Sequence, residues 1–79
     1  SLMETIQIDG GKKQKIRAGD ILGALTGEGA LNGTQVGKIN IKDNWSFVAV
    51  SSSAYKVALN KLATGKLKGK IFRVRLIRS

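Results

Sequence analysis

The chain has 79 residues, of which 42% are hydrophobic and 24% charged, and its formal net charge is +9 at pH 7. It contains no cysteine and no histidine, which excludes disulfides, thiol nucleophiles, zinc sites built on these residues and histidine acid–base chemistry. Its five acidic residues are far apart in the sequence, so we expect neither a paired-carboxylate active site nor a metal site. No apolar run approaches the ~20 residues of a membrane span, and no signal peptide is visible. This composition predicts a small binding domain for a polyanion, with nucleic acid first and an anionic membrane surface second.

The first half of the chain predicts a strand, a helix and a second strand. Residues 5–8 alternate, with Ile6 and Ile8 facing inward and Gln7 outward. After Gly10 and Gly11 comes a basic loop, and residues 18–26 then carry apolar side chains at helical spacing, namely Ile21, Leu22 and Leu25. Gly27 and Gly29 are expected to end this helix. Residues 37–42 alternate again, with Ile39 and Ile41 inward.

The second half predicts a strand, a helix and a last strand. Asp43-Asn44 is typical of a hairpin turn, and it leads into a strand over residues 45–50. The serines at 51–53 are candidate N-caps for a helix that carries Ala54, Val57, Ala58 and Leu62 and ends near Gly65. Leu67 is expected to fill the core, and residues 70–77 to form the last strand, with Phe72, Val74 and Leu76 on one face.

This order, β-α-β-β-α-β, predicts an α+β ferredoxin-like fold, in which a four-stranded antiparallel sheet has two helices on one face. The other face stays open. We assign to it Gln7, Lys38, Asn40, Lys42, Trp45, Phe47, Arg73 and Arg75. An aromatic centre flanked by basic strands is typical of sheets that bind RNA.

The third predicted strand resembles the consensus of the RNA recognition motif, Lys/Arg-Gly-aromatic-Gly/Ala-Phe-Val-x-aromatic. Trp45 and Phe47 occupy its outward aromatic positions, whereas Asp43, Asn44 and Val50 depart from it. The first strand has Gln7 where a stacking aromatic is expected, so the face offers fewer stacking platforms. Charged loops, above all residues 12–17, are expected to compensate. The same aromatic pair is also compatible with cross-strand packing.

Several segments in order resemble the C-terminal RNA-binding domain of bacterial DbpA-type DEAD-box RNA helicases. They are Gly-Asp-Ile-Leu-Gly-Ala-Leu-Thr-Gly at 19–27, Gly-Lys-Ile at 37–39, Phe-Val-Ala-Val at 47–50, and Lys-Gly-Lys at 68–70 followed by Arg-Val-Arg-Leu at 73–76. The resemblance covers nearly the whole chain from about Thr5. Ser1 and Leu2 look like a tag remnant, so we expect residues 1–3 to be a lead-in and residues 4–79 to form one domain of a longer helicase.

The resemblance implies an atypical RNA recognition motif that tethers an ATP-dependent helicase core in the same polypeptide to structured 23S rRNA, around hairpin 92, for large-subunit assembly in the cytoplasm. ATP and magnesium would belong to that core, and the fragment itself would have no catalytic residue, cofactor or metal. The resemblance implies that the missing first-strand aromatic is the family's own departure from ordinary RNA recognition motifs. An alternative to binding across the sheet is therefore that an RNA hairpin docks on the loops and the start of the first helix. The expected RNA contacts are Lys12, Lys13, Lys15, Arg17, Lys38, Asn40, Lys42, Trp45, Phe47, Arg73 and Arg75.

Two other functions fit the same architecture. A protein-interaction or dimerisation module would bury Trp45 and Phe47 against another protein. An acylphosphatase-like enzyme needs a catalytic arginine in an anion-binding loop and a supporting asparagine, and Arg17 and Asn40 are not convincingly placed for those roles. RNA binding remains the leading hypothesis.

Overall fold

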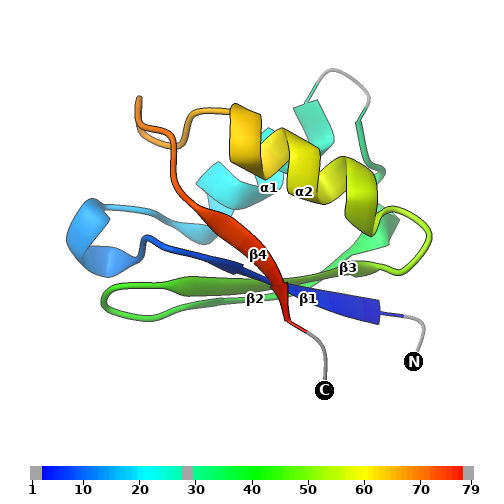
Figure 1. Cartoon of the computed structure of the whole chain (residues 1–79), viewed down its shortest axis with the longest axis horizontal. Helices are drawn as coiled ribbons and strands as arrows, with labels where there is room; N and C mark the ends of the chain where they lie inside the picture. Colours follow the sequence, from blue (N-terminus) through cyan, green and yellow to red (C-terminus); the bar gives the residue numbers. More distant parts are fainter. Residues whose placement is uncertain (1–2, 28–29, 78–79) are drawn as a thin grey trace.

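The structure is a computed structural model that describes residues 3–27 and 30–77. The predicted tag remnant at Ser1 and Leu2 and the predicted helix stop at Gly29 lie outside these residues. Four antiparallel strands form one sheet in the order β2-β3-β1-β4, and Figure 1 shows α1 and α2 on the same side of it. The ferredoxin-like prediction is therefore confirmed.

The observed elements lie close to the predicted ones. The strands are β1 (Met3–Ile8), β2 (Val36–Ile41), β3 (Ser46–Ser51) and β4 (Val74–Ile77), and the α-helices are α1 (Ala18–Thr26) and α2 (Tyr55–Thr64). Short 3₁₀ helices within the described residues include η1 (Lys12–Gln14) and η3 (Gly33–Gln35).

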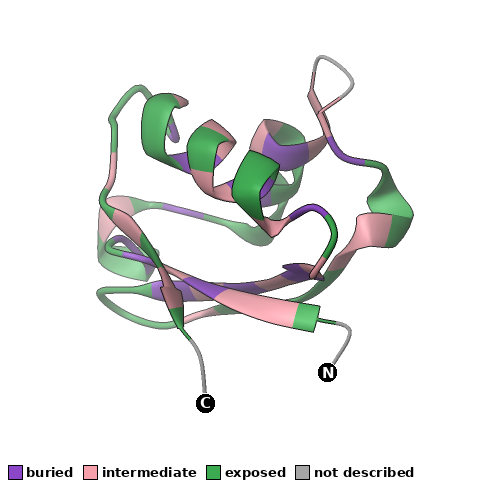
Figure 2. Cartoon of the chain, turned by 45° about the vertical axis from the view of Figure 1, so that its right-hand side comes forward, coloured by how far each residue is buried: buried purple, intermediate pink, exposed green. Residues whose placement is uncertain are grey.

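The core lies between the sheet and the two helices, where Figure 2 shows the buried residues. The sheet contributes Ile6, Ile8, Val48 and Val50, all fully buried. These positions alternate along β1 and β3, which is the period-2 pattern of a half-buried strand. Ile16, Leu31 and Leu67 close the core from the connecting segments, as expected for Leu67.

Each helix buries a narrower stripe than predicted. In α1, Ile21 and Leu25 are buried, while Leu22 is 41% exposed. In α2, Ala58 and Leu62 are buried, while Val57 is 47% exposed. Buried residues four apart lie above one another on a helix, whereas a residue next to one of them is turned by about 100°. The apolar spacing that predicts the two helices therefore includes Leu22 and Val57, which the structure leaves exposed.

Two of the differences from the predicted boundaries lie before β4 and before α2. The last strand begins at Val74 rather than at residue 70, because Leu67 and Lys70 form a separate tight turn before it. The serines do not cap α2: Ala54 is its N-cap and no side-chain cap bond forms, while the hydroxyls of Ser51 and Ser53 lie 2.9 Å apart and bond to each other. Residues 52–54 form a turn instead of the first helical residues.

Candidate nucleic-acid interface

One residue from each strand forms a row across the helix-free face of the sheet. Phe47 on β3 pairs with Asn40 on β2 and with Gln7 on β1, and Gln7 in turn pairs with Arg75 on β4. The row faces away from the helices because its neighbours Ile6 and Ile8 are buried on the other side. Three predicted contacts, Asn40, Phe47 and Arg75, are thus brought together, with Gln7 as the fourth member.

The other predicted sheet residues lie around this row. Lys38 is exposed on β2, near the irregular pairing between Val36 and Ile39, and Lys42 is exposed directly after β2 ends. Arg73 is exposed just before β4, and its carbonyl oxygen accepts a 2.8 Å hydrogen bond from the Asp9 amide. Cations therefore flank this row of four residues at both edges of the sheet.

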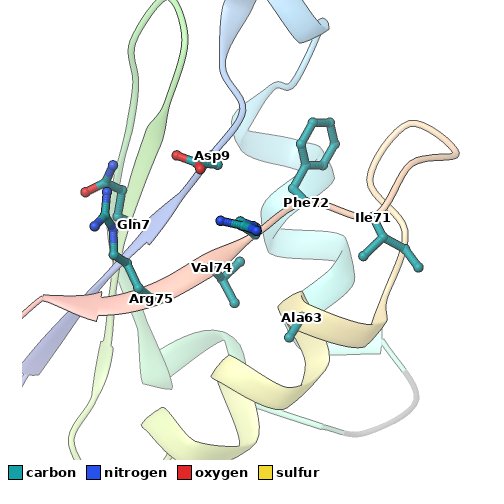
Figure 3. Close-up of a pocket in the computed structure, with 8 residues that line it drawn as sticks. Gln7, Asp9, Ala63, Ile71, Phe72, Val74 and Arg75 are labelled. Carbon is teal, nitrogen blue, oxygen red and sulfur yellow. The ribbon is translucent and has the colours of Figure 1, made fainter.

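A hollow wraps around the edge of the sheet at β4 (Figure 3). Figure 3 shows Gln7 and Arg75 on one side of the strand and Val74 with Ala63 of α2 on the other. Asp9 is the one carboxylate among the residues that line it. The hollow therefore brings this carboxylate together with Arg73 and Arg75 at the edge of the sheet.

The basic loop is docked on the β2–β3 hairpin through its backbone. The Lys12 amide donates to the carbonyl oxygen of Lys42 at 2.8 Å, and the Lys13 amide donates to that of Asp43 at 2.9 Å. Inside the loop, the Gly11 amide donates to Oε1 of Gln14 at 2.7 Å. The backbone of the loop is therefore held in place by these bonds, while its lysine side chains are exposed.

Two glycines at the start of the loop lie where a Cβ would be too close to its neighbours. A Cβ on Gly11 would collide with the Lys42 carbonyl and would lie 2.9 Å from both N and O of Trp45. A Cβ on Gly10 would lie 2.6 Å from Cδ1 of the buried Ile16 and 2.8 Å from the Phe72 ring. A side chain at Gly11 would push the loop off the hairpin because it would meet backbone atoms, whereas a side chain at Gly10 would press on the side chains of Ile16 and Phe72.

Trp45 lies on the rim of the sheet and not within it. The Lys42 amide donates to its carbonyl oxygen at 2.8 Å, which closes the hairpin, and β3 begins one residue later at Ser46. The prediction of a strand starting at Trp45 was therefore wrong by one residue. Trp45 is 45% exposed, whereas Phe47 is half-buried. The aromatic pair is thus divided between the hairpin end, beside the basic loop, and the centre of the sheet.

The same loop forms one wall of a groove, which we call the basic groove. Its other wall is the turn at residues 67–70. The groove is lined by Lys12, Lys13, Gln14, Lys15, Ile16, Arg17, Lys68 and Lys70. Six of these eight residues carry a positive charge and none is aromatic or acidic, so the groove matches the charge of a phosphate backbone.

The predicted contacts do not include Lys68 and Lys70, although all four predicted loop cations line the groove with them. About fifty residues separate the two walls in the sequence, and only folding brings them together. A signal was present: a glycine between two lysines, just after a helix, is typical of a tight turn that presents both side chains.

Asp20 links the two walls at the start of α1. Its Oδ2 accepts a 2.9 Å hydrogen bond from the Arg17 amide, which satisfies one of the free N–H groups at the helix N-terminus. Its Oδ1 lies 3.5 Å from Nζ of Lys68. The same carboxylate therefore contacts the loop backbone through one oxygen and the second wall through the other.

Residues 3–27 and 30–77 contain no cluster of acidic residues that would hold a metal ion. Within those residues, no helix is long and apolar enough to cross a membrane.

Comparison with known proteins gives one family for almost the whole chain. The family model described as the DbpA RNA-binding domain matches residues 5–76. The chain is 49% identical over 76 residues to the ATP-dependent RNA helicase DbpA of Escherichia coli K12, covering 96% of this chain and 17% of the helicase. It is 32% identical over 73 residues to the ATP-dependent RNA helicase DeaD of Mycobacterium tuberculosis, covering 92% of this chain and 13% of that protein. The chain thus spans between about an eighth and a sixth of the length of these relatives, and it belongs to the DbpA RNA-binding domain family.

Proposed function

We propose that this domain tethers an ATP-dependent DEAD-box RNA helicase to structured 23S rRNA, in the region of hairpin 92, and so directs the helicase to large-subunit assembly in the cytoplasm. The helicase core, with its ATP and magnesium, would be part of the same polypeptide. Supporting this are the family membership and the helicase names of the relatives.

The observation that carries the proposal is the backbone docking of the basic loop on the β2–β3 hairpin. It places the loop that carries the cations at 12–17 against the hairpin end, where Trp45 is exposed. Phosphates bind the cations and an unpaired base stacks on the ring. A structured RNA that has a stem and an unpaired loop offers both groups side by side.

The protein-interaction alternative gains little support from the central row. Phe47 is half-buried, and its partners across the sheet are the polar side chains of Gln7 and Asn40. Lys38 and Lys42 are exposed beside this row, and lysine is depleted at protein interfaces.

Binding of this domain to a hairpin 92 fragment of 23S rRNA tests the proposal. We expect the fragment to bind more tightly than an unrelated RNA hairpin of equal length and charge. The logarithm of the binding constant for both should fall linearly with the logarithm of salt concentration, with a slope of about 0.7–0.9 per phosphate neutralised. Equal affinity for the two hairpins would contradict the proposed target, and chemical footprinting on intact 23S rRNA would locate the site.

A further inference from the structure

Two lysines of the basic groove have a backbone conformation that L-residues disfavour. Among residues 3–27 and 30–77, Lys15 (φ 64°) and Lys68 (φ 52°) are the residues other than glycine with positive φ. In the left-handed region, Cβ crowds the following carbonyl oxygen, and lysine has no short polar side chain that would offset this by a local hydrogen bond. Both residues line the basic groove, one on each wall.

Lys15 takes this conformation at the end of η1. Its φ and ψ are 64° and 26°, and its amide donates to the carbonyl oxygen of Lys12 at 2.9 Å. The turn directs the next residue, Ile16, into the core, where it is 2% exposed. Glycine is the residue most common at such a helix end, so the fold itself does not require a lysine there.

Lys68 has the left-handed backbone conformation in the opposite wall of the groove. Leu67 and Lys70 exchange two backbone hydrogen bonds of 2.8 and 3.0 Å, and φ is positive at both central residues, Lys68 and Gly69. This is the pattern of a type I′ turn, for which Asn-Gly is the strongly preferred pair. The lysine therefore also replaces a residue that would suit the backbone better.

We propose that Lys15 and Lys68 are the paired phosphate-binding residues of the basic groove, retained in a strained backbone because RNA binding needs a fixed cation on each wall. The inference rests on the proposed RNA-binding function. It adds that Lys15 and Lys68 bind the RNA and that they bind its phosphate groups. Because no aromatic side chain lines the groove, its ligand is the RNA backbone and not a stacked base. A short, strained turn also fixes the direction in which each side chain leaves the backbone.

Lys15→Gly and Lys68→Asn test this, since each removes a charge and supplies a residue that suits positive φ. We expect each variant to melt higher by about 4 °C. We also expect each to bind the 23S rRNA hairpin fragment about fivefold more weakly and to lower the salt slope by about 0.7–0.9. Lys15→Arg and Lys68→Arg keep the charge and should retain the affinity and the slope.

Two control variants separate strain from charge. Lys13 lines the same groove but lies in η1 and has no positive φ, so Lys13→Asn should weaken binding less than Lys15→Gly or Lys68→Asn and should not raise the melting temperature. Lys56→Asn, on α2 and outside the groove lining, should change the binding little.

Wild-type affinity and slope in Lys15→Gly and Lys68→Asn would overturn the inference, and so would a melting temperature lower than that of the wild type. Failure of the proposed function has a different signature: the wild-type protein itself would not prefer the 23S hairpin over the unrelated one. The salt slopes can be measured on either RNA, so the two failures are distinguishable.

Discussion

The hydroxyl of Ser46 donates a 2.6 Å hydrogen bond to the carbonyl oxygen of Gly10, thirty-six residues earlier in the chain. Ser46 is fully buried at the start of β3. This bond joins the first residue of the central strand to the glycine from which the basic loop departs. It therefore connects the position of the basic loop to the position of the β2–β3 hairpin.

Replacing Ser46 by alanine leaves the Gly10 carbonyl without this partner in a buried site. We expect Ser46→Ala to lower the free energy of unfolding by about 1–3 kcal/mol, the cost of an unsatisfied buried acceptor. Urea unfolding measures it. Ser53→Ala, at an exposed serine, should change the free energy by less than about 0.5 kcal/mol; equal effects of the two variants would contradict the role of the buried bond.

Gly11→Ala should disturb the docking of the basic loop. The added Cβ meets backbone atoms of Lys42 and Trp45 that cannot rotate away, so we expect a loss of about 1–3 kcal/mol in the free energy of unfolding. RNA affinity should also fall, because the loop cations move relative to Trp45. Chemical denaturation and RNA titration of the same variant check both; an unchanged protein would show that the contact is not tight.

Gly23→Ala is the opposite case. Gly23 lies inside α1, and a Cβ there would meet nothing within 4 Å. Alanine in a helix interior is about 0.8–1 kcal/mol more favourable than glycine, so this variant should be more stable than the wild type, with unchanged RNA affinity. Thermal melting should show a rise of about 4–8 °C, and a lower melting temperature would contradict the open space at this position.

Trp45→Ala should weaken RNA binding with little effect on folding. The ring is 45% exposed, so its removal leaves no large cavity, whereas loss of one stacked base costs about 1–3 kcal/mol of binding free energy. RNA titration with Trp45→Phe as the control checks this, since a phenyl ring still stacks. A folded Trp45→Ala protein with wild-type affinity would exclude a stacking role for Trp45.

Asp20→Asn should strengthen RNA binding at low salt. The Asp20 carboxylate lies 3.5 Å from Nζ of Lys68, so it offsets one of the groove cations. Removing its charge should raise the affinity by a few-fold at low ionic strength, and the gain should shrink above about 0.15 M salt, where the Debye length is about 8 Å. RNA titration at two salt concentrations measures the difference; weaker binding at low salt would contradict this electrostatic effect.

Most of the scaffold was predictable because it depends on local periodicity. The bounds of α1 and the inward positions of Ile6, Ile8, Ile39 and Ile41 follow from spacing alone, and the structure confirms them. Boundaries that depend on tertiary contacts were missed. The late start of β4 follows from the tight turn at Leu67 and Lys70, and the displacement of Trp45 from β3 follows from its place at the hairpin end.

The site was only half predictable for the same reason. Charge density marked residues 12–17 and alternation marked the row around Phe47, since both signals are local. The second wall of the basic groove was not predicted, because Lys68 reaches the loop only through folding and the Asp20 ion pair. Strand register likewise had to be known before Gln7 and Arg75 were seen as neighbours.

The docking of the basic loop also bears on how RNA preference can change. The hairpin recognises the amide groups of residues 12 and 13, and these groups are identical for every amino acid except proline. The lysine side chains at these two positions are exposed and take no part in those bonds. Substitutions there can therefore alter the surface offered to RNA while the frame that carries it stays intact, which makes this loop a natural place to retarget the domain by design.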